Sequence, residues 1–223
     1  GRLWRLGQPS RPRLKAIAQK WLGRNLRTWN VWFAIWKEVW ETDHSDATTL
    51  DLVRKWLHHT PLVLPAWVAA WEIAWHRSEG DSELVELATL WLDDTPHDHG
   101  AWPKVWLFLW EKDKANPALR AQGRTWMSTA PFDAGSWPVM WRAVWSFDKP
   151  ASTLQTAALS WVKLQQSFKH GDWYNIWNEA LGFAEDKAEL IVLGRQWLRQ
   201  TYLENNTWVS VLTRLRKAMP EDP

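Results

Sequence analysis

The chain has 223 residues, and 23 of them are Trp, beside only 2 Tyr and 6 Phe. A hydrophobic content of 46% and a charged content of 23% are typical of a globular protein and exclude a disordered chain. Cys is absent, which excludes disulfides, zinc–thiolate sites and Cys nucleophiles. No apolar run approaches the roughly 18 residues of a transmembrane helix. We therefore expect a cytoplasmic protein without a membrane segment.

The Trp residues follow a repeat. Six of them, the anchor tryptophans, lie 35 or 36 residues apart, and an anchor is typically followed by a triplet of Trp residues at 11, 15 and 19 residues. The anchors are Trp21, Trp56, Trp91, Trp126, Trp161 and Trp197. The complete triplets are Trp32, Trp36 and Trp40; Trp67, Trp71 and Trp75; Trp102, Trp106 and Trp110; and Trp137, Trp141 and Trp145. The fifth unit is shifted by one residue to Trp173 and Trp177, and the sixth retains Trp208.

The spacing predicts a pair of helices in each repeat. Trp residues four apart form one stripe of a helix, and the apolar positions around each anchor also recur at helical intervals. Gly80, Asp81 and Ser82 end one helix and cap the next, and Pro61 and Pro96 follow helix ends. In chain order we expect helices near 11–22, 29–42, 46–58, 65–77, 81–94, 101–113, 116–128, 135–147, 150–164, 171–183, 186–200 and 206–218.

These elements predict an all-α fold, a right-handed α-solenoid of about six antiparallel helical hairpins of 35 residues. We expect one domain over 1–223, with a partial unit at 1–28, five repeats at 29–200, and a capping helix and tail at 201–223. The partial first unit predicts that an N-terminal portion of the same polypeptide is missing. Most Trp side chains are expected in the core, the anchors and the middle members of the triplets above all.

The array resembles the tetratricopeptide repeat. The period, the Pro between units and the Trp six residues later, as from Pro61 to Trp67 and from Pro96 to Trp102, carry this resemblance over nearly the whole chain. Half-a-tetratricopeptide and prenyltransferase α-subunit repeats are similar hairpins. The family has small residues where Trp36, Trp71 and the anchors stand here. We therefore expect helices that lie further apart or cross differently.

The resemblance places the third triplet members beside a concave groove. We predict that this groove binds a protein or peptide, with aromatic anchors and polar side chains that orient the partner. Packing of the same column against the next repeat is the competing interpretation. The predicted contact residues are Trp40, Trp75, Trp110, Trp145, Tyr174, Lys37, Arg142 and Asn178.

Charge is unevenly distributed. Residues 1–30 carry eight basic groups and no acid, whereas the rest of the chain has a net charge of −6. No motif of a nucleic-acid reader accompanies the basic segment, so nucleic acid is an improbable partner and a solvated face or a domain contact is favoured. Helical arrays of this kind form the C-terminal sensor region of some bacterial multidomain defence and signalling proteins, and the resemblance suggests that placement.

No enzymatic site is predicted. The tripeptide at 80–82 resembles a hydrolase signature but lies between two helices, where capping explains it. His58–His59 and His97–His99 are short polar pairs without a third metal ligand at helical spacing. We therefore expect no catalytic residue, no metal and no cofactor. The alternative functions are a non-catalytic scaffold similar to a prenyltransferase α-subunit, and carbohydrate binding by exposed Trp rings.

Tryptophan fluorescence separates these possibilities. If most indoles are core residues, we expect blue-shifted emission that is protected from soluble quenchers. A substantial red-shifted, quencher-accessible fraction would instead indicate an exposed aromatic platform for a ligand.

Overall fold

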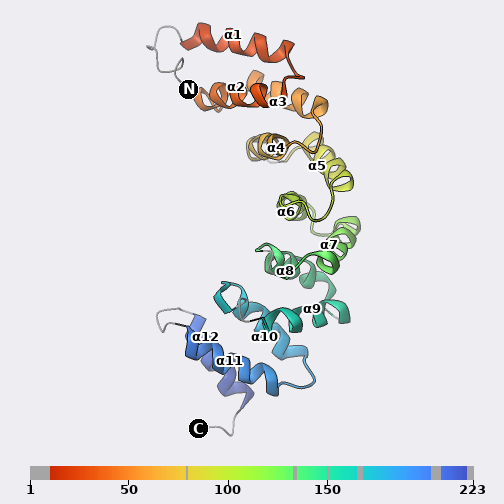
Figure 1. The fold of residues 1–223 in the computed structure, drawn as a ribbon, viewed down its shortest axis with the longest axis vertical. Helices are drawn as coiled ribbons and strands as arrows, with labels where there is room; N and C mark the ends of the chain where they lie inside the picture. Colours follow the sequence, from red (N-terminus) through yellow and green to blue (C-terminus); the bar gives the residue numbers. More distant parts are fainter. Residues whose placement is uncertain are drawn as a thin grey trace. The chain divides into compact units, whose positions relative to one another are not determined.

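The computed structural model (Figure 1) describes residues 11–78, 80–132, 135–149, 151–164, 168–201 and 207–219. This part of the chain contains twelve α-helices and no strand. They are α1 (Arg11–Arg24), α2 (Trp29–Thr42), α3 (Ala47–His59), α4 (Pro65–Ser78), α5 (Ser82–Asp94), α6 (Trp102–Lys112), α7 (Pro117–Thr129), α8 (Trp137–Asp148), α9 (Ser152–Val162), α10 (Trp173–Phe183), α11 (Ala188–Gln200) and α12 (Thr207–Ala218). Each predicted helix is confirmed to within two residues at either end.

The chain divides into two compact units, residues 1–115 with α1–α6 and residues 116–223 with α7–α12. Within each unit the even-numbered helices carry the Trp triplets, and we call them first helices. The odd-numbered second helices carry the anchors. Helices that follow one another within a unit pack together, and several helices also pack on the next of their kind, as α1 on α3, α2 on α4, α3 on α5, α8 on α10 and α10 on α12. This order of packing is that of an α-solenoid and confirms the predicted all-α class.

Short polar side chains cap the second helices α3, α5 and α7. The side chain of Asp46 accepts a hydrogen bond from the Thr48 N–H, and that of Asp81 accepts one from the Leu84 N–H. Gly80 precedes Asp81 with φ of 64°, a conformation that favours glycine, and its N–H donates to the Trp75 carbonyl. The tripeptide at 80–82 is therefore a stop and a cap, as the sequence predicted.

In every repeat but that of Trp137, the first member of the triplet closes the preceding helix. Its indole N–H donates to a carbonyl in the last turn of the second helix before it, where the helix itself offers no donor. The donors and acceptors are Trp32 and Leu22 at 2.8 Å, Trp67 and Leu57 at 3.2 Å, Trp102 and Leu92 at 3.3 Å, Trp173 and Val162 at 3.2 Å, and Trp208 and Leu198 at 3.2 Å.

The second members and the anchors repeat two further bonds. A second member donates to the first turn of the next second helix: Trp36 to Thr49, Trp71 to Leu84, Trp141 to Leu154 and Trp177 to Leu190, all at 2.8 to 2.9 Å. An anchor donates to the loop of the preceding hairpin: Trp91 to Leu62, Trp161 to Phe132 and Trp197 to Phe168. Within each unit, these Trp residues tie one hairpin to the next.

The rings also stack on one another. In the first unit, the Trp32 ring lies 5.0 Å from that of Trp56 and 6.3 Å from that of Trp36, with the planes nearly parallel. In the second unit, Trp173 makes the same two contacts with Trp197 and Trp177, both at 5.5 Å. Aromatic pairs at these separations add about 0.5–1.5 kcal/mol to the burial of each ring.

Small residues make room for the large rings. The position three residues before the anchor is Ala88 in α5, Ala158 in α9 and Gly194 in α11, and all three are buried. A Cβ atom on Gly194 would lie 2.6 Å from Cζ2 of Trp177 and 3.1 Å from a methyl group of Leu215. Small side chains have therefore not disappeared from the helix contacts, but stand at a different position from the tetratricopeptide pattern.

Gly194→Ala is expected to destabilise the second unit by about 1–3 kcal/mol, because the fully buried Trp177 ring has no space to retreat. Gly182→Ala, in the exposed face of α10, is the matched control, since a Cβ there meets nothing within 4 Å. This control is expected to stabilise by roughly 0.5–1 kcal/mol through helix propensity. Urea unfolding followed by circular dichroism measures both. A Gly194→Ala variant as stable as the parent would contradict the close packing.

Candidate surfaces for partner binding

The four third members of the triplets are core residues. Trp40, Trp75, Trp110 and Trp145 are 7%, 8%, 2% and 6% exposed. Each ring lies between 4.9 and 5.6 Å from that of its second triplet member. The rings therefore offer a partner only their edges, and most of their area contributes to folding.

The next hairpin supplies the cover on this column. The Trp145 indole N–H donates to the Glu179 carboxylate of α10 at 3.0 Å, and the Phe183 ring lies 5.1 Å from the Trp145 ring. In the first unit, the Trp75 ring contacts the Phe108 ring of α6 at 5.7 Å, and its edge lies against Gly80. These rings therefore pack against the next repeat, as the competing interpretation of the column expects. Their contribution to binding stays a prediction.

The polar residues of the predicted groove reach solvent to different extents. Lys37 is exposed on α2 in the first unit. Arg142 is exposed on α8 but pairs with Asp172 at 2.9 Å. Tyr174 and Asn178 are half-buried on α10, which packs against α8. The second unit thus places Arg142, Tyr174 and Asn178 on two adjacent first helices.

A second surface lies on the other kind of helix. The side chains six and two residues before each anchor point from one second helix toward the start of the next, and we call these the two junction positions. In the first unit α1 and α3 each hold one cation at these positions, whereas α5 has Val85 and Thr89 there. Lys15 of α1 lies 2.9 Å from Asp43 and 2.7 Å from Asp46, both at the start of α3.

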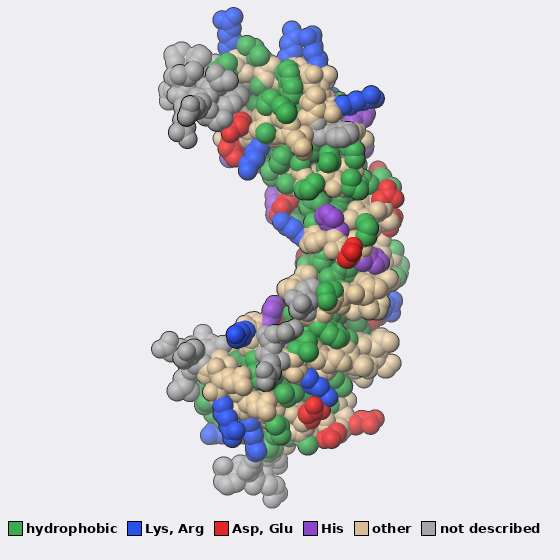
Figure 2. Space-filling view, viewed as in Figure 1, with side chains coloured by type: hydrophobic (Ala, Val, Ile, Leu, Met, Phe, Trp, Pro, Cys, Tyr) green, Lys and Arg blue, Asp and Glu red, His purple; other side chains and the backbone are tan. Residues whose placement is uncertain are grey.

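Arg54 of α3 repeats the arrangement one hairpin later. Its guanidinium binds the carboxylate of Asp81, the cap of α5, and lies 3.7 Å from that of Glu83. His58 lies 2.9 Å from the same Glu83. A cation from one second helix thus meets the acids at the start of the next. Figure 2 shows further Lys and Arg side chains over the α1 end of this unit, where the sequence is basic.

In the second unit, α7 uses both junction positions. The guanidinium of Arg120 lies 5.1 Å above the Phe147 ring at the end of α8. Arg124 pairs with Asp148 at 3.3 Å. Two arginines of the chain therefore fill the space between α7, the end of α8 and the start of α9.

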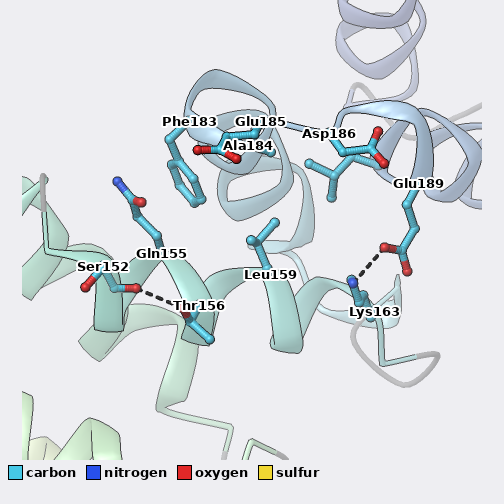
Figure 3. Close-up of a pocket in the computed structure, with 11 residues that line it drawn as sticks. Ser152, Gln155, Thr156, Leu159, Lys163, Phe183, Ala184, Glu185, Asp186 and Glu189 are labelled. Carbon is cyan, nitrogen blue, oxygen red and sulfur yellow. Dashed lines mark hydrogen bonds and ion pairs between the residues drawn. The ribbon is translucent and has the colours of Figure 1, made fainter.

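The junction positions of α9 lack a cation. They hold Gln155 and Leu159, and between them and the start of α11 lies a pocket of about 450 Å³ (Figure 3). The Phe183 ring lies at one side of it, at the position equivalent to Phe147. Glu185 and Asp186 follow on the connection to α11. We call this space the α9–α11 pocket.

The acids of this pocket differ in what they contact. Glu189 pairs with Lys163 at 2.7 Å, and Asp186 accepts a hydrogen bond from the Ala188 N–H at 2.9 Å. Within the described part of the chain, neither Glu185 nor Asp186 has an ion-pair partner. Figure 2 shows acidic side chains gathered at the connection from α10 to α11. Sequence reasoning missed this pocket, although aligning the junction positions of successive repeats reveals the missing cation.

The His pairs have structural contacts. The His97 ring packs edge-on against Trp102 at 4.9 Å, and His99 Nδ1 accepts a hydrogen bond from the Ala101 N–H. Among the described residues, no group of three His, Asp or Glu side chains is arranged to hold a metal ion. In the same residues, no helix is long and apolar enough to span a membrane.

Comparison with known proteins adds no relative. No family model matches the chain, and neither a curated protein nor a solved structure is significantly similar to it.

The cluster around Lys15 makes stability depend on pH. Burial by itself raises the pKa of Asp46, but hydrogen bonds from Lys15, Thr49 and the Thr48 N–H outweigh it and lower this pKa to about 2. Because the pKa of Asp46 is lower in the folded state, its ionised carboxylate stabilises the fold at pH values above the unfolded pKa of 3.8. This stabilisation is lost as the pH falls through the folded pKa.

Asp46→Asn should therefore lower stability at pH 7 by about 1 kcal/mol, with a difference from the parent that shrinks between pH 4 and pH 2. Asp51→Asn is the control, since Asp51 forms only an exposed pair with Lys55. Urea midpoints measured from pH 2 to pH 7 provide the comparison. A difference that does not vary with pH would exclude ionic stabilisation by Asp46.

Proposed function

We propose that this chain is a protein-binding repeat module, the recognition part of a larger protein, and that it has no catalytic role of its own. Placement in a bacterial defence or signalling protein, in the cytoplasm, belongs to the same proposal. Protein or peptide partners fit best, because the helices of each unit offer a varied surface of side chains on a repeating frame.

One observation supports the proposal most strongly. The buried Trp residues recur in every repeat, whereas the less buried residues beside them differ from repeat to repeat. The residue after the second triplet member is Lys37, Glu72, Leu107, Arg142 and Asn178 in successive repeats. None of these is fully buried. The buried Trp residues beside them keep the same register throughout. A constant core with a different side chain on each repeat gives a surface specific to one partner.

The ion pairs on the first helices limit which groups are free to bind. Glu72 is paired with Lys104 at 2.7 Å, and Arg142 with Asp172. These pairs link neighbouring first helices and lie at the surface, where such pairs contribute about 0–1 kcal/mol. A partner can therefore displace them at small cost. Lys37 of the first unit, and Tyr174 and Asn178 of the second, are further polar residues of the first helices.

Selection of displayed random peptides on the immobilised chain tests the proposal. We expect families of related sequences to be enriched. A variant carrying Lys37→Glu and Arg142→Gln, with unchanged circular dichroism and melting temperature, is expected to select different families. The Trp frame is the same in both proteins, so any change reports on the surface.

Two results would contradict the proposal in different ways. Enrichment no greater than on the bare support would exclude a peptide-binding surface. A stable one-to-one complex with an enzyme subunit, with no enriched peptide, would instead support the non-catalytic scaffold similar to a prenyltransferase α-subunit. Mass photometry of the chain in complex distinguishes the second result from the first.

A further inference from the structure

We propose that the α9–α11 pocket binds an arginine side chain of a partner protein. This inference rests on the proposed protein-binding function and names the chemistry of one contact. The pocket lies wholly within the second unit, and its lining differs from the same positions of the preceding repeat.

The first step is the equivalence of the positions. Gln155 and Leu159 stand where α7 has Arg120 and Arg124, 35 residues earlier. Phe183 stands where α8 has Phe147, 36 residues earlier, which matches the one-residue shift of the fifth unit. The aromatic ring that receives a guanidinium in one hairpin is therefore present in the next, while the arginine is not.

The second step is the space that the missing arginines leave. Gln155 and Leu159 are shorter than Arg and end without a charge, and the pocket of about 450 Å³ lies beside both. Figure 3 shows the Phe183 ring on the side of Gln155 and Leu159 that faces the pocket. A guanidinium is planar and stacks on aromatic faces, so the exposed part of this ring suits it.

The third step is the charge of the rim. Glu185 and Asp186 lack an ion-pair partner among the described residues, whereas Asp81 and Asp46, the N-caps of α5 and α3, pair with Arg54 and Lys15; the N-cap of α11 is Lys187. Glu185 and Asp186 can each accept hydrogen bonds from a guanidinium. Leu159 and Leu190 give the pocket an apolar wall that fits the methylene stem of Arg.

Arginine fits better than lysine for the same reasons. Its guanidinium can stack on Phe183 while its edge donates to a carboxylate, as a planar fork allows. An ammonium group is a compact point charge and would be strongly hydrated at this rim. The pocket should therefore distinguish arginine from lysine and, more strongly, from the uncharged citrulline.

The test uses the intact chain and N-acetyl-arginine methylamide as the probe, with the lysine and citrulline counterparts for comparison. Nuclear magnetic resonance follows the Leu159 methyl groups and the Gln155 side-chain amide. We expect saturable shifts at both groups with the arginine probe, weaker shifts with lysine and none with citrulline. Equal shifts with all three probes, or no saturable shift with arginine, would overturn the inference.

Two substitutions make the test specific. Gln155→Arg supplies the chain's own guanidinium, as Arg120 does for Phe147, and is expected to abolish the shift at Leu159. Thr153→Arg is the matched control, because it adds the same charge to an exposed position of α9 outside the pocket. Unchanged arginine binding in Gln155→Arg, or an equal loss in both variants, would contradict the pocket as the site.

Neutralising the rim completes the argument. Glu185→Gln with Asp186→Asn is expected to weaken arginine binding on the order of tenfold, because a charge-assisted hydrogen bond becomes a neutral one. The melting temperature shows that the variant folds. If arginine does not bind in the pocket but peptides are still enriched, the inference about the pocket is wrong and the proposed function is still supported. Saturable arginine binding without enriched peptides would support the pocket and contradict the wider function.

Discussion

The indole N–H is the constraint on which this structure depends. Each Trp carries one donor and no acceptor, and a donor buried without a partner costs about 1–3 kcal/mol. The chain meets this cost with backbone carbonyls, in the same three places of successive repeats. Among the described residues, Trp145 donates to the Glu179 carboxylate instead, and the buried indoles of Trp56 and Trp137 have no acceptor. Because the acceptors lie at helix ends and in loops, the bonds fix where each helix stops as well as where the rings lie.

The same constraint explains why Trp occupies positions that are small in the tetratricopeptide family. A second triplet member must reach the first turn of the next second helix, and only a long side chain with a donor at its end does so. Its ring then needs an opposing gap, which Gly194 provides for Trp177. The size pattern has changed, and large and small residues still oppose each other across the contact.

Much of this fold was predictable because its signals are local. A four-residue Trp spacing defines a helix face, and Asp81 or a Pro defines a boundary, without knowledge of any neighbour. The burial of Trp145 depends on Glu179 and Phe183 of the following hairpin, so spacing alone left its exposure undecided. The α9–α11 pocket is harder still, because it results from side chains that are absent at Gln155 and Leu159.

The anchor positions and the junction positions differ in what a substitution costs, which explains how one repeating fold can support recognition. Replacing an anchor Trp changes a hydrogen bond, a stack and a loop together, so such positions vary little between repeats. Replacing an arginine at a junction position removes only a partly exposed ion pair or stack, which costs little stability. It also leaves an aromatic ring and the nearby acids without a cation to contact, as at Phe183. A binding pocket thus requires no new structure in this fold, only the loss of cations such as Arg120 and Arg124 of α7.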